Sequence, residues 1–170
     1  MKLLKIFDKR DKQLGQQPII YRDSVRAIIL KDGKILLVFS EVSNEYKFPG
    51  GGVNEQEIRH IALKREVLEE TGRKVSSVNE SLGYVDQIYN DIYNERVYFY
   101  LRSFYYFCEV TDEISNHNID IYEKKLKFVP RWVTIEEAIK VNQEKFDKGS
   151  EHHWTERELF VLKLLKEMRP

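Results

Sequence analysis

Three glutamates stand at positions 66, 69 and 70 of this 170-residue chain. On a helix with 3.6 residues per turn, positions i, i+3 and i+4 share one face, so the three carboxylates lie together. Like charges at this spacing repel each other and destabilise an isolated helix. Clustered carboxylates are hard oxygen ligands for Mg²⁺ or Mn²⁺, ions that also bind phosphates. The spacing therefore predicts a divalent metal site on Glu66, Glu69 and Glu70.

A solvated acidic helix is the alternative, and it is the usual meaning of a glutamate-rich helix. Its charged face would lie opposite a single apolar stripe. Here apolar residues flank the acidic face on both sides of an idealised helical wheel, with Ile58, Ile61 and Leu68 on one side and Leu63 and Val67 on the other. This arrangement predicts a partly enclosed acidic face, with the solvent side formed by His60, Lys64 and Thr71.

The segment resembles the signature of the Nudix (MutT-like) hydrolase family, G-x5-E-x7-R-E-U-x-E-E-x-G-U, in which U is a bulky apolar residue. The matching positions are Gly51, Glu57, Arg65, Glu66, Val67, Glu69, Glu70 and Gly72. The last position differs, because Arg73 stands where the family prefers an aliphatic residue, and this affects the expected packing at the helix exit. The preceding Phe48-Pro49-Gly50-Gly51-Gly52 is similar to the lead-in of the family.

The resemblance implies hydrolysis of the pyrophosphate bond in a nucleoside diphosphate linked to another group, with Mg²⁺ or Mn²⁺ as cofactor. By matched position, the metal ligands are Glu66, Glu69, Glu70 and the backbone carbonyl of Gly50. Glu57 and Arg65 are expected to pair and to orient the acidic residues, which completes the catalytic set. The alternative is a Nudix-fold ligand-binding or regulatory module without catalysis, although such modules usually lose the carboxylates that this chain retains.

The general base that activates the water lies either on the helix or on a later loop. The segment from Thr111 to Lys127 offers Asp112, Glu113, Asp120 and Glu123. Glu123 is favoured because it lies shortly before the strand that contains Trp132. A loop carboxylate that is simply solvated is the other interpretation.

Two further residues are candidates for substrate binding. Arg26, on the first apolar strand, is either a phosphate contact or an ordinary outward-facing strand residue. Tyr89 lies in the region where some dinucleoside-polyphosphate hydrolases keep a tyrosine. Many relatives also carry a basic residue after the second strand. This chain has Phe39-Ser40-Glu41 there, so one phosphate contact is expected to be missing.

The aromatic stretch at positions 97–107 reads as a strand with two distinct faces. One face is interpreted as core and holds Val97, Phe99, Leu101, Tyr105 and Phe107. The other holds Tyr98, Tyr100, Arg102, Phe104 and Tyr106. Because tyrosine and arginine are enriched at interfaces, this second face predicts a homodimer contact or plain packing rather than base stacking.

Composition limits the partners and the location. Lysines plus arginines and aspartates plus glutamates both number 28, so no positive surplus exists for binding long nucleic acid. The charged amino terminus is unlike a signal peptide, and no apolar run reaches membrane-spanning length. Cys108, the only cysteine, is expected to be a buried thiol, and the four histidines lack ligand spacing. We therefore expect a cytoplasmic protein that acts on a small nucleotide-type substrate without membrane contact.

The expected elements form an α+β fold. They begin with a hairpin of strands 25–30 and 35–39 around Asp32-Gly33, followed by a helix 58–71 that Gly72 ends. Strands within 75–110, with a turn at 91–95, and a strand 127–133 with Pro130 at an edge or bulge come next. The last two elements are a helix from the Thr134 cap to about 144 and a helix 155–168. The resemblance implies a Nudix-type α/β/α sandwich with a mixed sheet and a central catalytic helix. A single domain is expected over residues 1–170, with the Nudix core at about 25–144, an N-terminal extension at 1–20 and the C-terminal helix at about 155–168.

Overall fold

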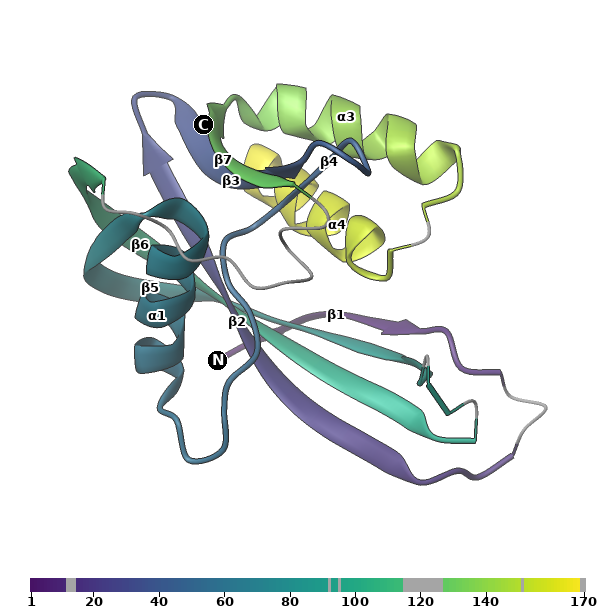
Figure 1. The fold of residues 1–170 in the computed structure, drawn as a ribbon. Coiled ribbons are helices and arrows are strands. Elements are labelled where there is room, and N and C mark those ends of the chain that lie inside the picture. Colours follow the sequence, from purple (N-terminus) through teal and green to yellow (C-terminus); the bar gives the residue numbers. More distant parts are fainter. Residues whose placement is uncertain (12–14, 92, 95, 115–126, 151, 169–170) are drawn as a thin grey trace.

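The computed structural model describes residues 1–11, 15–91, 93–94, 96–114, 127–150 and 152–168. They form a mixed sheet flanked by helices (Figure 1). The strands follow the order β1-β5-β6-β2-β3-β4, and β7 pairs with β3. Their bounds are β1 (Leu3–Asp8), β2 (Ile19–Lys31), β3 (Lys34–Ser40), β4 (Glu45–Lys47), β5 (Arg73–Asn90), β6 (Tyr98–Ile114) and β7 (Phe128–Val133). The helices are α1 (Arg59–Thr71), α3 (Ile135–Asp147) and α4 (Trp154–Glu167).

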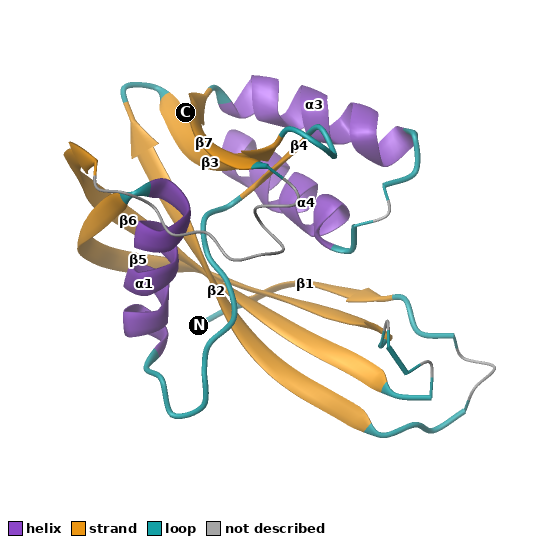
Figure 2. Cartoon of the chain, in the orientation of Figure 1, coloured by secondary structure: helices purple, strands orange, loops and turns teal. Residues whose placement is uncertain are grey.

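Helices cover both faces of the sheet (Figure 2). Successive residues of a strand point to opposite faces, and β2 shows this alternation clearly. Its residues Val25, Ala27 and Ile29 pack in one apolar cluster with residues of α1. Its residue Ile28 belongs to a second apolar cluster with residues of α3 and α4. The predicted α/β/α sandwich is therefore confirmed.

The predicted hairpin is also present. Leu30 pairs with Ile35 and Lys31 with Lys34, while the turn residues at 32 and 33 both have positive φ angles, as a type I′ turn requires. Beyond the hairpin β2 pairs in parallel with β6, from Ile19 to Ile29. Along its other edge, β2 forms backbone hydrogen bonds with the glycine-rich loop that follows β4.

Helix α1 begins and ends where the sequence predicts, but its burial differs. Gly72 ends the helix with a φ of 68°, and its N–H donates to Leu68 O at 2.9 Å. Thr71, expected on the solvent side, is 2% exposed, and its hydroxyl donates to Val67 O at 2.6 Å. Ile58 and Ile61, expected to flank an enclosed face, are 70% and 56% exposed. The prediction was wrong here because one side of α1 packs on the sheet, which leaves the Ile58 side in solvent.

The segments expected outside the Nudix core pack against it. Strand β1 pairs in parallel with β5. Helix α4 contributes Val161, Leu162 and Leu165 to the same apolar cluster as Ile28. Helix α3 begins at the predicted Thr134 cap, whose hydroxyl accepts a hydrogen bond from Glu137 N–H at 3.1 Å. Within the described residues, no helix combines the length and the apolar character needed to cross a membrane. A single domain over residues 1–170 stays a prediction.

The aromatic faces of β6 are only partly as expected. Three residues assigned to the possible dimer face are buried: Tyr98 is 3% exposed, and Phe104 and Tyr106, which α1 covers, are 4% and 5% exposed. Arg59 lies 3.7 Å above the Phe104 ring. Among the members of that face, Tyr100 and Arg102 are half-buried beside a cavity of about 290 Å³. A homodimer contact stays a prediction, confined to this end of the strand.

Cys108 on β6 is the buried thiol that the sequence predicts. Its side chain belongs to the apolar cluster under α1, and the residue is 5% exposed. Burial raises the pKa of the thiol to about 12. The group is therefore protonated at neutral pH and chemically inert.

Candidate active site

The glycine-rich loop lies along the open edge of β2. Gly51 O accepts a hydrogen bond from Val25 N–H at 2.9 Å, and Pro49 O accepts one from Ala27 N–H at 2.8 Å. Gly50 has a φ of 139°, and a Cβ at this position would overlap Val25 O. Only glycine fits such a conformation at such close approach. The loop therefore continues the sheet, and β2 determines its position.

Glu66 of α1 lies against this loop. A Cβ on Gly51 would overlap the Glu66 carboxylate, so the glycine permits the loop and the helix to approach each other. The Glu66 side chain is 14% exposed. Burial raises the pKa of its carboxyl, because the charged form loses hydration. A carboxylate enclosed in this way gains from any cation placed beside it.

Arg65 joins three of the predicted site carboxylates. Its Nε and Nη2 each donate to Glu57 at 2.9 Å, while its Nη1 donates to Glu66 at 2.6 Å and to Glu69 at 3.2 Å. Glu57 also accepts from Asn54 N–H at 3.0 Å. These bonds, chiefly those from Arg65, lower the pKa of Glu57 to about 2. The structure thus brings together Glu57, Arg65, Glu66 and Glu69, with the last two directed at one nitrogen.

Glu70 is 1% exposed and is engaged by the protein. One of its oxygens accepts from Lys47 Nζ at 2.6 Å, and the other accepts from Gly50 N–H at 2.8 Å. The carbonyl of Gly50, a further predicted metal ligand, accepts from Arg26 Nη1. Within the part of the chain that the structure describes, no three carboxylates, histidines or cysteines gather closely enough to hold a metal ion. The expected ligand atoms of Glu70 and Gly50 instead accept hydrogen bonds from the cationic side chains of Lys47 and Arg26.

A cavity of about 250 Å³ lies beside the loop, and its walls come from β2, β4, α1 and α4. It is lined by Arg22, Arg26, Lys47, Gly50, Gly51, Gly52, Glu66, Trp154 and Arg157. Four of these side chains are cationic and one is a carboxylate. Such a lining attracts a ligand that carries several negative charges. Arg26, predicted as a phosphate contact, is 9% exposed and lies in this cavity.

Sequence reasoning missed Arg22, Lys47 and Arg157. A basic residue was sought after the second strand and was absent there, whereas Lys47 on the next strand brings a cation to the cavity. Its place directly before Phe48-Pro49-Gly50 was the signal that could have found it. Arg157 had no comparable signal, because a charged residue on an amphipathic helix normally faces solvent.

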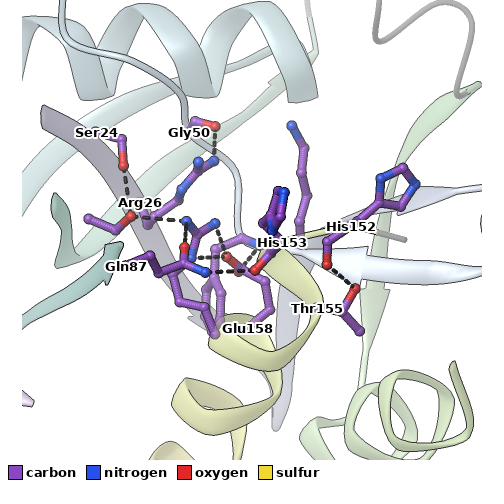
Figure 3. Close-up of polar contacts among 12 residues, drawn as sticks. Ser24, Arg26, Gly50, Gln87, His152, His153, Thr155 and Glu158 are labelled. Carbon is purple, nitrogen blue, oxygen red and sulfur yellow. Dashed lines mark hydrogen bonds and ion pairs between the residues drawn. The ribbon is translucent and has the colours of Figure 1, made fainter. Parts of the chain in front are cut away.

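Arg157 and Glu158 form a buried ion pair in the first turns of α4. They are 2% and 0% exposed. Two Arg157 nitrogens donate to one Glu158 oxygen, at 2.9 and 2.5 Å, and a third donates to Gln87 at 2.7 Å and to Ser103 at 3.1 Å. The second oxygen of Glu158 accepts from Phe48 N–H at 2.8 Å. Figure 3 shows Gln87 and Glu158 in this network close to Arg26 and Gly50. Helix α4 therefore anchors the start of the glycine-rich loop.

The remaining predicted residues lie away from the cavity or outside the described residues. Tyr89 is half-buried and stacks on His153 with ring centroids 4.1 Å apart. His152 stacks on Trp154 at 4.0 Å in the same way, so both histidines pack against aromatic rings. Glu123, the favoured loop base, lies outside the described residues.

Comparison with known proteins agrees with this arrangement. The family model described as the NUDIX domain matches residues 20–155. The solved structure of a NUDIX hydrolase from Nitrosomonas europaea is similar with a TM-score of 0.59 and 19% identity, over 87% of this chain and 90% of that chain. The E. coli ORF135 protein is similar with a TM-score of 0.51 and 22% identity, over 88% of this chain and 94% of that chain. At these identities the likeness concerns the fold. No curated protein sequence matches the chain.

Proposed function

The chain belongs to the Nudix family and is a Nudix-type pyrophosphohydrolase, and from this premise we propose that it hydrolyses a nucleoside diphosphate linked to another group, with Mg²⁺ or Mn²⁺ as cofactor. The observation that carries the proposal is the cavity in which Glu66 and the glycine-rich loop lie beside Arg26, Lys47 and Arg157. Carboxylates suit a metal ion and cations suit phosphates, so one space offers both. This is the combination that hydrolysis of a phosphate chain requires.

Glu66, Glu69, Glu70 and the carbonyl of Gly50 are the groups that we propose as metal ligands. Carboxylate and carbonyl oxygens are those that Mg²⁺ and Mn²⁺ prefer. Glu66 and Glu69 reach the same Arg65 nitrogen, at 2.6 and 3.2 Å, so one protein cation already bridges their oxygens. A bound ion would offset phosphate charge and lower the pKa of a bound water.

Lys47 and Arg26 are expected to exchange partners when the substrate binds. In the structure they are bonded to Glu70 and to the Gly50 carbonyl. Phosphate oxygens form strong charge-assisted hydrogen bonds with ammonium and guanidinium groups. Movement of the two cations onto the phosphates would release both oxygen ligands at the same time.

Arg65 acts as a positioning residue in this proposal. Its guanidinium donates to Glu57 through Nε and to Glu66 and Glu69 through Nη1. These bonds keep the carboxylates of the acidic face in place. Water attacks one phosphorus, a new P–O bond forms and the bridging P–O bond breaks, which gives a nucleoside monophosphate and the phosphorylated second group. The water proton passes to a carboxylate, either Glu69 on the helix or Glu123 on the later segment.

The remaining parts of the proposal concern partners and location. The substrate is a small nucleotide, because a net charge of zero offers no surplus for long nucleic acid. A cytoplasmic location without membrane contact fits the single, buried and free Cys108. Tyr89 does not line the cavity, so it would contact only a part of the substrate that extends out of the cavity. A homodimer would use the exposed end of the sheet around Tyr100 and Arg102.

A substrate screen tests the proposal. The purified protein is assayed with Mg²⁺ or Mn²⁺ against nucleotide sugars, dinucleoside polyphosphates, ADP-ribose, NADH and nucleoside triphosphates. Glu69→Gln should lower turnover by about 10²-fold or more while the fold is kept, because one charged group of the site is lost at nearly constant shape. Glu144→Gln, which changes an exposed glutamate on α3, is the matched control. The proposal fails if no substrate is hydrolysed with either metal, or if Glu69→Gln turns over like the wild type.

A further inference from the structure

Two residues that line the cavity each have a buried nitrogen donor that lacks an acceptor among the described residues. They are Arg26 Nε and Trp154 Nε1, and both residues line the cavity. Arg26 is 9% exposed, and its Nη1 is already bonded to Gly50 O. A buried N–H without an acceptor is unfavourable, so native proteins normally supply a water or a ligand group there. The pair of donors therefore indicates that an acceptor is to be bound at this place.

Arg157 adds a fixed guanidinium, paired with Glu158, to the lining of the same cavity. Its guanidinium is held by Glu158, Gln87 and Ser103 at distances of 2.5 to 3.1 Å. A buried guanidinium held by three partners cannot swing out to solvent, so it keeps its place when a ligand arrives. Glu66, the carboxylate in the lining, comes from α1. The contribution of β2 and α4 is therefore made of donors and cations alone.

We propose that Arg26, Trp154 and Arg157 form a second phosphate subsite, here called the α4 subsite. It would take a phosphate group of the substrate next to the pyrophosphate placed at α1, and Arg26 would contact both. A phosphate has several acceptor oxygens and negative charge, which match two N–H groups without an acceptor and the cationic Arg22 and Arg26 of the lining. A neutral carbonyl would leave the charge unused, and a metal ion would be repelled. The inference rests on the proposed hydrolysis, and it implies that chains of three or more phosphates bind better than a diphosphate.

Calorimetric titration with inorganic triphosphate tests the α4 subsite, with inorganic diphosphate for comparison. EDTA is present throughout, so that no metal contributes to binding. Trp154→Phe removes one N–H and keeps an aromatic ring, while Trp132→Phe changes the other tryptophan, which does not line this cavity. We expect the wild type and Trp132→Phe to bind triphosphate more tightly than diphosphate. Trp154→Phe should lose about tenfold or more in triphosphate affinity, because a hydrogen bond to a charged acceptor is removed.

Several results would overturn the α4 subsite. One is that Trp154→Phe binds triphosphate as tightly as the wild type, and another is that Trp132→Phe loses as much triphosphate affinity as Trp154→Phe. The wild type binding triphosphate and diphosphate equally tightly, or binding neither anion, would also overturn it. If Trp154→Phe does not keep the wild-type circular dichroism spectrum, Arg26→Lys replaces it. This change keeps the charge but removes the whole guanidinium, both the Nε–H and the Nη1–H that is bonded to Gly50 O, so a loss of about tenfold or more is expected. Because these titrations involve neither metal nor turnover, their failure leaves the hydrolysis proposal standing, and that proposal fails separately on the Glu69→Gln assay.

Discussion

Glu158→Gln probes whether α4 holds the cavity together. The carboxylate is 0% exposed, accepts two bonds from Arg157 and accepts a third from Phe48 N–H. Glutamine keeps the size of the side chain and one carbonyl oxygen, so packing is nearly unchanged. Two things change. The Arg157 guanidinium, 2% exposed, is left buried without its counter-charge, and one of the two accepting oxygens becomes an NH2 group that cannot accept a hydrogen bond.

The expected cost follows from this burial. Removing one member of a buried ion pair typically destabilises a protein by about 3–5 kcal/mol, because the remaining charge is dehydrated without compensation. For a chain of this length each kcal/mol lowers Tm by about 2–4 °C, so a fall of about 10 °C is expected. Urea denaturation followed by circular dichroism gives the free energy of unfolding directly. The value of kcat/KM should fall as well, since Glu158 anchors the glycine-rich loop through Phe48.

Two further variants make the experiment decisive. Glu167→Gln, which changes an exposed glutamate of the same helix, should stay within about 0.5 kcal/mol of the wild type. The double variant Arg157→Met with Glu158→Leu removes both charges and should recover most of the lost stability. The reasoning is refuted if Glu158→Gln costs less than about 1 kcal/mol, or if the double variant is no more stable than the single one.

Four other outcomes are expected. Glu57→Gln should lower the free energy of unfolding by about 1 kcal/mol at pH 7. Because the pKa of Glu57 is depressed to about 2 in the folded state, the difference from the wild type in urea titrations should shrink as pH falls from about 4.5 towards 2. A difference independent of pH would contradict the Arg65 pairing. Cys108, with its pKa raised to about 12, should resist iodoacetamide at pH 8 in the native state and react in denaturing urea; rapid native labelling would contradict its burial. Millimolar Mg²⁺ or Mn²⁺ should raise Tm, more so with a nucleotide present, and an unchanged Tm would count against a metal site. Glu123→Gln should lower kcat by about 10²-fold or more with little change in KM if Glu123 is the base, whereas normal turnover in this variant would place the base on the helix.

Local patterns in the sequence were enough to predict most of the elements. Periodicity and Gly72 placed α1 within one residue of its observed start, and Asp32-Gly33 placed the first hairpin. These signals work because helix periodicity, caps and tight turns depend on residues only a few positions apart. The contact between Glu57 and Arg65 follows from the same logic, since both residues stand on or just before one helix.

Burial of polar groups could not be predicted in this way. The sequence placed Thr71 in solvent and named no residue of α4 for the site, yet Thr71 is buried and α4 lines the cavity with Trp154 and Arg157. A charged side chain on a helix normally marks a solvated face, and only its partners show otherwise. For Arg157 one of those partners, Gln87, lies 70 positions away in the chain.

The sequence by itself determined the acidic face of α1, the glycine-rich loop and the family to which they belong. The tertiary structure decided which cations meet that face and which atoms they occupy. Lys47 bonds to Glu70, Arg26 bonds to the Gly50 carbonyl, and Glu158 holds Phe48 from 110 positions away. Such contacts depend on how β2, β4 and α4 pack around one space. No pattern of neighbouring residues encodes that packing, because the free energy that creates it comes from burial of the whole sheet between its helices.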